Sequence, residues 1–409
     1  MRARRPGAST RAGGAMRIAM FTDYFFPELG GIQDSVATIS RALARRGHQV
    51  DICAPRYGKR DYRRIGAPPR ERDLGAAVRI RRRASLPFPS TTRQSRAALI
   101  SPLGWTSLAL DGRPDLIHVH SFFGIGLEAL FNAACLRLPV VGTNHTTVAG
   151  FAPLLPMSVQ KASAYVAWFY NRCDCVTAPS RSVFEELHGA GLRRPRRVVS
   201  NPIDTELFRP PCAEERAELR ARFGFDSFTV AYAGRLGPEK NVAALLRALA
   251  AIPPGAARPT LVLAGHGSQE PALRNLAAEM GIAASVRFLG TLPQSRLAAL
   301  LRAADTFAIM STSETQSMAL LQAMASGLPV VAADSRALPE FVTPANGALV
   351  DPHDPRAVAA ALRALAATPD RCRRMGQAGR AIAERYGIET IADEWEQLYR
   401  SVLQGRLAA

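Results

Sequence analysis

The chain alternates strand-like and helix-like segments along almost its whole length, and this alternation constrains the fold more than any other feature. Short apolar runs are followed by longer runs with helical spacing, beginning at Arg17–Phe21. Such a rhythm predicts parallel sheets covered by helices, so the expected fold class is α/β with doubly wound sheets. The predicted strands are 17–21, 49–53, 78–81, 116–120, 140–143, 175–178, 229–233, 260–264, 286–289, 306–310 and 330–332.

The chain length of 409 residues exceeds what one hydrophobic core supports and fits two domains of about 200 residues each. The strand rhythm pauses at a basic, proline-containing stretch before residue 201 and then restarts. The N-terminus is basic and lacks an apolar segment, which is not typical of a signal peptide. We therefore predict a disordered leader over 1–15, Rossmann-like domains over 16–200 and 201–385, and a C-terminal helix within 386–409.

Positive charge is concentrated in the N-terminal half. Residues 1–200 contain 30 Lys and Arg against 13 Asp and Glu, a net charge of +17, whereas residues 201–409 contain 22 against 21, a net charge of +1. This asymmetry predicts an anionic partner, either a membrane surface or a nucleic acid. Few aromatic residues are interleaved with the basic stretch, so we expect no nucleic-acid partner. The anionic membrane surface remains, with Arg81, Arg82 and Arg83 among its contacts.

The expected location follows from apolar and cysteine patterns. No run of about 18 or more apolar residues is present to span a bilayer. The six cysteines lie far apart except Cys173 and Cys175, and no second pair completes a zinc site. Reduced thiols are typical of cytoplasmic proteins. We therefore expect a cytoplasmic protein that associates peripherally with the inner face of the membrane.

Two loops between a strand and a helix carry residues suited to phosphate. Gly30-Gly31 follows the first predicted strand, and paired glycines let backbone N–H groups approach a phosphate at a helix start. Gly234, Arg235 and Lys240 follow the first strand of the second half. Arg presents a bidentate fork and Lys a mobile point charge, so these cations suit a diphosphate. Either feature alone is also compatible with an ordinary turn or solvated surface charge.

A third loop, over 313–317, precedes another predicted helix. Glu314 lies in this loop, and residues from Thr315 to Ser317 offer backbone N–H groups at the helix start. A carboxylate accepts hydrogen bonds from sugar hydroxyls, while backbone amides donate to anionic oxygens. The loop therefore indicates a ligand that carries both sugar hydroxyls and anionic oxygens.

Together these loops resemble the family 4 retaining glycosyltransferases of the GT-B fold, and the resemblance covers nearly the whole chain from Met16. That family carries a Glu, seven further residues and a second Glu. Glu314 fits the first position, and Gln322 stands where the family has the second. The resemblance also includes Gly265-His266-Gly267 and Thr143-Asn144-His145-Thr146. The branch that glucosylates diacylglycerol is the most similar.

The resemblance implies an architecture and a set of roles. Two Rossmann-like domains would face a central cleft, and the C-terminal helix would cross back to the N-terminal domain. The implied catalytic residues are Glu314, His145, Arg235 and Lys240. The implied donor-binding residues are Gly30, Gly31, Gly234, Arg235, Lys240, Gly265, Gly267, Leu289, Glu314, Thr315, Gln316, Ser317, Met318 and Gln322. The implied acceptor-binding residues are His120, Asn144 and His145.

The implied reaction is transfer of a hexose, with retention of configuration, from a nucleotide-diphosphate sugar to an acceptor hydroxyl. The resembled branch and the basic N-terminal half favour a membrane glycolipid precursor such as diacylglycerol as the acceptor. The chain lacks a D-x-D pattern, so we expect no metal and no other cofactor. Arg235 and Lys240 would instead balance the charge of the departing diphosphate. The segment 151–157 would either enter the membrane interface or pack against the cleft.

Three alternatives stay open. The acceptor is a soluble sugar or polyol in neighbouring branches of the family. A non-catalytic relative that only binds a nucleotide sugar is also compatible, since Gln322 holds a ribose hydroxyl more weakly than Glu would. A nicotinamide-dependent dehydrogenase shares the βα alternation, but the chain lacks G-x-G-x-x-G.

Two further histidines lie close together on a predicted strand. His118 and His120 alternate along it, so we expect their side chains to point to opposite faces of the sheet.

Overall fold

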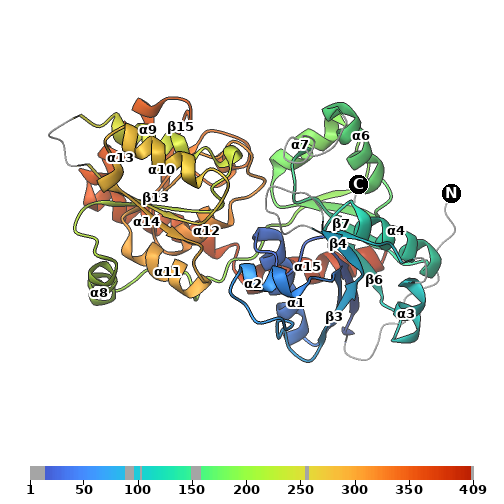
Figure 1. The fold of residues 1–409 in the computed structure, drawn as a ribbon. Coiled ribbons are helices and arrows are strands. Elements are labelled where there is room, and N and C mark those ends of the chain that lie inside the picture. The colour runs from blue at the N-terminus through green and yellow to red at the C-terminus, as the bar shows by residue number, and fades with distance from the viewer. Residues whose placement is uncertain (1–13, 88–95, 102–103, 149–157, 254–257, 407–409) are drawn as a thin grey trace. The chain divides into compact units, whose positions relative to one another are not determined.

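The computed structural model describes residues 14–87, 96–101, 104–148, 158–253 and 258–406. The chain divides into two compact units: unit 1 (Met1–Pro202 with Ile388–Ala409) and unit 2 (Ile203–Gly387). Each unit is built on a parallel sheet covered by helices (Figure 1). The doubly wound α/β fold predicted from the alternation is therefore confirmed. Most of the predicted leader and the segment 151–157 lie outside the described residues.

Unit 1 contains a seven-stranded sheet in the order β3-β2-β1-β6-β7-β8-β9. Its strands are β1 Arg17–Phe21, β2 Gln49–Pro55, β3 Val78–Arg83, β6 Leu116–Val119, β7 Val140–Thr143, β8 Cys175–Ala178 and β9 Arg196–Val198. Its helices are α1 Gly31–Arg45, α2 Lys59–Arg64, α3 Gly104–Leu110, α4 Gly124–Leu136, α6 Val159–Tyr170, α7 Arg181–Gly189 and α15 Ile388–Leu403. A separate antiparallel hairpin joins β4 Ser85–Pro87 to β5 Arg96–Ala98.

Unit 2 contains a six-stranded parallel sheet in the order β12-β11-β10-β13-β14-β15. Its strands are β10 Thr229–Ala233, β11 Thr260–Ala264, β12 Val286–Gly290, β13 Thr306–Ile309, β14 Val330–Ala333 and β15 Gly347–Val350. Its α-helices are α8 Ala213–Phe223, α9 Val242–Ala250, α10 Glu270–Glu279, α11 Gln294–Ala303, α12 Met318–Ala325, α13 Pro355–Ala366 and α14 Pro369–Glu384. The short 3-10 helices are η3 Pro238–Lys240, η4 Ala283–Ser285 and η5 Leu338–Glu340.

Alternating side chains of β10 fill two separate cores. Ala231 and Ala233 pack with residues of α11 and α12, whereas Val230 and Tyr232 pack with residues of α9, α10 and α13. Figure 1 shows these two helix groups on opposite faces of the sheet. Because both faces are covered, all five residues of β10 are buried and only Thr229 is polar, as is usual for parallel strands buried on both sides.

In each sheet the strand order reverses beside the first strand. In unit 1 the reversal lies between β1 and β6, and in unit 2 it lies between β10 and β13. The loops that leave adjacent strands at such a point turn to opposite faces of the sheet, which opens a crevice at their carboxyl ends. These two places are where a doubly wound sheet holds ligands.

Helix α15 belongs to unit 1, although unit 2 precedes it in the chain. Arg46, at the end of α1, forms ion pairs with Glu389 at 2.9 Å and Asp393 at 2.5 Å. On its buried side the helix places the Tyr399 hydroxyl 2.7 Å from Nδ1 of His118. The last helix therefore completes the interior of unit 1.

The arginines of β3 form ion pairs within unit 1, which argues against the prediction that they contact a membrane. Arg81 Nε lies 3.0 Å from Asp51 Oδ1, and Arg82 Nη2 lies 2.7 Å from Glu71 Oε2. Arg83 Nε lies 2.7 Å from Oε1 of the buried Glu128. These guanidinium groups compensate carboxylates of unit 1 itself, and their side chains are only 10–13% exposed.

Candidate active site

Three loops of unit 2 meet at the carboxyl edge of its sheet. The loop after β10 hydrogen-bonds to the loop after β11, with Leu236 N donating to His266 O at 3.1 Å. The loop after β13 joins them, because Thr312 N donates to Glu239 O at 3.3 Å. The topology therefore brings together residues that are distant in sequence, at the strand-order reversal of unit 2.

The glycines of two loops permit this close packing. A Cβ atom on Gly265 would lie 1.9 Å from Gly234 O, and one on Gly267 would lie 2.3 Å from Leu236 O. Gly265 also has a φ of 147°, which side chains disfavour. The close contact of the two loops therefore requires glycine at positions 265 and 267, since any other residue would push the loops apart.

Lys240 and Glu314 form an ion pair between the loops that follow β10 and β13. Lys240 Nζ lies 2.7 Å from Glu314 Oε1, and Glu314 is buried. Only one carboxylate oxygen is used by this contact, and Lys240 has two further N–H donors. The pair therefore presents both hydrogen-bond acceptor and donor capacity at one position.

Arg235 lies on the same loop and is more exposed than Lys240. Its Nη2 atom lies 2.6 Å from Glu239 Oε1, and the Tyr232 hydroxyl donates to its carbonyl oxygen at 2.9 Å. The structure thus places Arg235, Lys240 and Glu314 in the loops of adjacent strands. Each cation already has a carboxylate partner, so an anionic ligand would share or displace these contacts.

Helix α12 begins at Met318, four positions after Glu314. Ser317 caps the helix, with its Oγ accepting from Leu320 N at 3.2 Å. The preceding residues differ in exposure, with Gln316 buried and Thr315 half-buried. Gln322 is also buried, and its Nε2 donates to Gln294 Oε1 at 3.3 Å. Gln322 therefore has a polar partner on α11 that the sequence did not reveal.

Two of the expected donor-binding residues have mainly apolar surroundings. The half-buried side chains of Leu289 and Met318 pack against the core of unit 2 beneath α11 and α12. Any polar contact from these positions would use the backbone.

Gly30 and Gly31 lie in unit 1 at the start of α1 and are exposed, so they are not in the unit that holds Arg235.

Three histidines of unit 1 cluster at its own strand-order reversal. His120 Nδ1 lies 3.1 Å from His145 Nε2, and their rings are stacked. The rings of His118 and His120 are only 3.9 Å apart, so the expectation that they point to opposite faces is wrong. Strand β6 ends at Val119, and the alternation of side chains does not continue to His120.

The histidine cluster is tied to the surrounding secondary structure. Besides Tyr399, His118 contacts Thr143 through Nε2 and Oγ1 at 2.6 Å. Burial lowers the pKa of His118 and His120, and it lowers the pKa of His145 to about 4. These imidazoles are therefore neutral at physiological pH. Asn144 is buried, and its Oδ1 accepts from Thr146 N at 3.2 Å.

Asp23 is a further polar residue that the sequence did not assign to the site. It follows β1, and its Oδ2 accepts from Ser121 Oγ at 2.6 Å, while its Oδ1 accepts from Ile125 N at 2.9 Å. Burial raises its pKa against the effect of these hydrogen bonds. The sequence does contain a signal that could have identified Asp23 as a site residue, namely a carboxylate just after the first strand of a doubly wound sheet. That strand borders the reversal point, where such sheets bind ligands.

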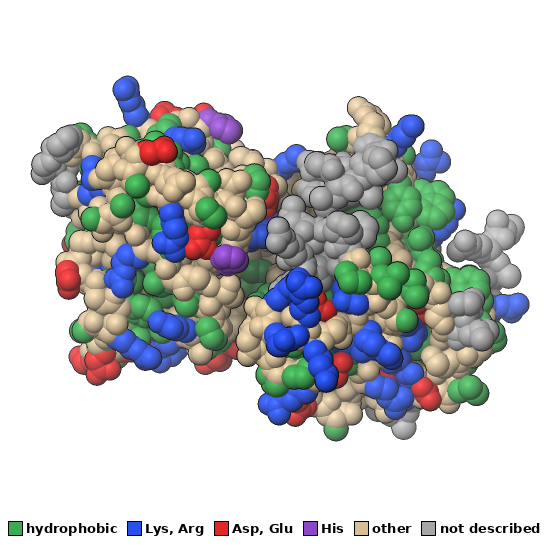
Figure 2. Space-filling view, viewed as in Figure 1, with side chains coloured by type: hydrophobic (Ala, Val, Ile, Leu, Met, Phe, Trp, Pro, Cys, Tyr) green, Lys and Arg blue, Asp and Glu red, His purple; other side chains and the backbone are tan. Residues whose placement is uncertain are grey.

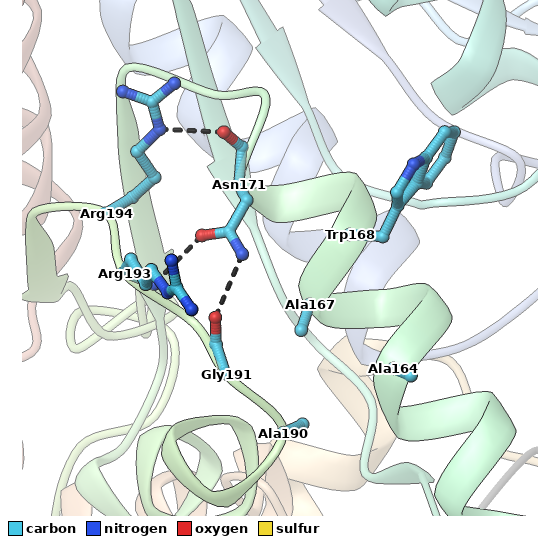
Figure 3. A pocket seen from close by; sticks show the side chains of 8 residues that line it. All are labelled: Ala164, Ala167, Trp168, Asn171, Ala190, Gly191, Arg193 and Arg194. Carbon is cyan, nitrogen blue, oxygen red and sulfur yellow. Dashed lines mark hydrogen bonds between the residues drawn. The ribbon is translucent and has the colours of Figure 1, made fainter.

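A cavity of about 580 Å³ lies elsewhere in unit 1, between α6 and the loop before β9 (Figure 3). The Asn171 side chain holds that loop, since its Nδ2 donates to Gly191 O at 3.0 Å and its Oδ1 accepts from Arg193 N at 2.9 Å. None of the predicted site residues lines this cavity. It is therefore separate from the candidate site.

Within the described part of the chain, no group of three or more His, Cys, Asp and Glu side chains is arranged to hold a metal ion. Among the same residues, no helix has both the length and the apolar character needed to cross a bilayer.

Comparison with known proteins gives matches along both units. Residues 215–382 match the family described as glycosyl transferases group 1, and residues 29–207 match glycosyltransferase family 4. The α-monoglucosyldiacylglycerol synthase of Streptococcus pneumoniae is 31% identical over 87% of this chain and 79% of its own length. The D-inositol 3-phosphate glycosyltransferase of Nocardia farcinica is 32% identical over 93% of this chain and 85% of its own length. The GDP-mannose-dependent α-mannosyltransferase of Mycobacterium tuberculosis is 30% identical, with 82% and 84% covered.

Solved structures share the fold at lower identity. Anabaena HepE in complex with UDP and glucose superposes with a TM-score of 0.74 at 23% identity, over 94% of this chain and 100% of that chain. The sucrose-phosphate synthase of Thermosynechococcus elongatus superposes with a TM-score of 0.77 at 21% identity, over 95% and 100%. These similarities show the fold alone.

Proposed function

The chain belongs to family 4 of the glycosyltransferases and is a glycosyltransferase of the GT-B fold, and from this premise we propose a specific reaction. The enzyme transfers a hexose, with retention of configuration, from a nucleotide-diphosphate sugar to a hydroxyl of a membrane glycolipid precursor such as diacylglycerol. The observation that carries the proposal is the meeting of Arg235, Lys240 and Glu314 at the strand-order reversal of unit 2.

The cations would act on the departing diphosphate. Negative charge on its oxygens increases as the bond to the sugar breaks, so contacts from Arg235 and Lys240 strengthen in the transition state. Lys240 can keep Glu314 as a partner while its other N–H groups reach an anionic oxygen. The reaction would then need no metal ion, because the two side chains supply the compensating charge.

Glu314 and the start of α12 would hold the sugar and the phosphate. The free oxygen of the Glu314 carboxylate can accept from a sugar hydroxyl, and backbone amides near Gln316–Met318 donate at the positive end of the helix. Gln322 would accept from a ribose hydroxyl through its amide oxygen while its Nε2 remains on Gln294. HepE, whose structure was solved with UDP and glucose, makes a uridine nucleotide the first donor to test.

His145 would face the reacting sugar as a neutral imidazole. The low pKa that burial gives it allows one ring nitrogen to donate and the other to accept at pH 7. His120 fixes its orientation through their shared hydrogen bond, and Asn144 holds the same loop. A neutral donor suits a sugar hydroxyl, whereas a cation there would oppose the positive charge that develops at the anomeric carbon as the diphosphate leaves.

The acceptor assignment is supported by the synthase from Streptococcus pneumoniae and by the basic charge of the N-terminal half. It places the enzyme peripherally on the cytoplasmic face of an anionic membrane. The relative named for D-inositol 3-phosphate supports a second candidate, transfer to a soluble polyol or sugar. The third candidate is a protein that binds the nucleotide sugar without transferring the hexose.

The experiment is a screen of purified protein against UDP- and GDP-sugars with diacylglycerol vesicles and with soluble polyols. We expect hexose transfer to the lipid, with retention detected by the anomeric coupling constant of the product. Glu314→Ala should lower the rate at least tenfold, since a lost charged contact costs about 1.5–3 kcal/mol. Transfer only to a soluble acceptor supports the second candidate, and donor binding without any transfer or hydrolysis supports the third.

A further inference from the structure

The exposed cations of α2 differ from the paired arginines of β3. Lys59, Arg60 and Arg63 are exposed, and none forms an ion pair within the described residues. They lie on one short helix at the surface of unit 1. Positive side chains without internal partners keep their charge available for an external anion.

The neighbouring β4–β5 hairpin has one exposed face that is entirely apolar. Ser85 pairs with Ala98 and Leu86 pairs with Ala97, so side chains alternate between the two faces of this ribbon. Ser85, Arg96 and Ala98 are half-buried against unit 1. The exposed side chains are Ala84, Leu86, Pro87, Ala97 and Leu99, followed by Ile100. Leu86 is 60% exposed, Leu99 53% and Ile100 49%. Large aliphatic groups rarely gather on a surface without a partner.

Contacts between the hairpin and α2 make these features one surface. Arg96 Nη1, on the inner face of the hairpin, lies 3.0 Å from Oδ2 of Asp61 in α2. The Ser85 hydroxyl donates to Arg56 O, in the segment that leads into α2. Figure 2 shows Lys and Arg side chains together with hydrophobic ones on the front of unit 1.

We propose that this α2–hairpin surface (Lys59, Arg60, Arg63, Ala84, Leu86, Ala97, Leu99 and Ile100) docks unit 1 on the interface of an anionic lipid bilayer. The inference rests on the proposed lipid acceptor and names the surface that reaches it. Cations attract anionic headgroups, while aliphatic side chains enter the interfacial layer, and stable binding needs both. A second copy of the chain fits less well, because a two-fold contact would bring the cations of α2 near their own copies.

The test compares variants of the full-length protein by sedimentation with vesicles of zwitterionic lipid containing about 30% anionic phospholipid. One variant carries Lys59→Ser, Arg60→Ser and Arg63→Ser, and another carries Leu86→Ser and Leu99→Ser. The matched control carries Arg193→Ser, Arg196→Ser and Arg197→Ser, which remove three exposed charges of the same unit beside the cavity of Figure 3. All substituted side chains are exposed, and thermal unfolding checks that each variant remains folded.

We expect both surface variants to bind vesicles at least tenfold more weakly than the wild type, because one loses three headgroup contacts and the other loses two aliphatic side chains from the interfacial layer. The control should lose less than about threefold. Added salt should weaken binding of the wild type and of the leucine variant more than that of the α2 variant, because only the α2 variant lacks these charges.

Three results would overturn the assignment. Equal losses in the α2 and control variants would mean that net charge, rather than this surface, drives binding. A changed sedimentation coefficient of the leucine variant without vesicles would make the hairpin a contact between copies. No vesicle binding by the wild type at low salt would remove the docking surface altogether. Transfer to a short-chain diacylglycerol dispersed without vesicles tests the proposed reaction separately, and the docking variants should retain it.

Discussion

Replacing Lys240 by methionine should destabilise unit 2, because it leaves the Glu314 carboxylate without its cation. The two charged groups lie 2.7 Å apart, and the Lys240 and Glu314 side chains are 20% and 9% exposed. Methionine retains most of the aliphatic stem, so the substitution removes mainly the ammonium group. A charge-assisted hydrogen bond contributes about 1.5–3 kcal/mol, and partial access of water to the lysine places Lys240→Met near about 2 kcal/mol.

A double-mutant cycle measures the coupling free energy between Lys240 and Glu314. Glu314→Gln keeps the size and one oxygen acceptor and should cost about 1 kcal/mol, because the ammonium group of Lys240 can still reach water. The double variant Lys240→Met with Glu314→Gln leaves neither charge unpaired. It should therefore cost about 1–1.5 kcal/mol less than the sum of the two single variants.

The assay uses the distribution of tryptophan between the units. The three Trp residues, Trp105, Trp168 and Trp395, all belong to unit 1, so their fluorescence follows unit 1, whereas far-UV circular dichroism follows both units. Urea unfolding of the four proteins should shift the dichroism transition of unit 2 and leave the fluorescence transition in place. A coupling free energy below about 0.3 kcal/mol, the usual error of additivity, would refute the pairing.

The remaining predictions concern the reaction and its pH dependence. Arg235→Ala should lower kcat roughly tenfold or more with a smaller change in the donor KM; a pure KM effect would make Arg235 a binding residue only. Gln322→Glu should tighten donor binding in calorimetric titration, and abolished activity would show that Gln322 serves another role. Transfer should persist in EDTA, and strict dependence on a divalent ion would contradict the two-cation mechanism. Because burial lowers the pKa of His145 to about 4, the unfolded chain takes up this proton first as the pH falls from about 6.5. His145 should contribute roughly 3 kcal/mol to the fall in the free energy of unfolding of unit 1 between these pH values, followed by Trp fluorescence, and His145→Gln should reduce the fall by that amount.

The interior strands were predictable because a strand buried on both faces is a predominantly apolar run. β1, β7, β8, β10 and β11 begin and end where the sequence predicts. The outer strands lack that signal: β9 is Arg196–Val198, three exposed residues with two arginines, and it was not predicted. The β4–β5 hairpin was also missed, since its strands are short and bear their apolar side chains on the exposed face.

Individual site residues were predictable by type, while their partners were not. Lys240 and Glu314 were each assigned to a ligand, yet 74 positions separate them, and only the adjacency of β10 and β13 brings them together. The hydrogen bond from Gln322 to Gln294 also depends on how α11 packs beside α12. Sequence spacing describes one loop at a time, and the strand order of the sheet decides which loops meet.

The membership of α15 in unit 1 has a consequence for the order in which the protein is made. His118 and its partner Tyr399 are 281 positions apart, and the whole of unit 2 is translated between them. The ribosome therefore releases a contiguous unit 2 before unit 1 can close, although most of unit 1 is synthesised first. Until α15 emerges, the buried imidazole of His118 lacks its phenolic partner, and the α1 side of the first sheet lacks its cover. A chaperone that binds nascent chains would find its target there, in the older part of the polypeptide.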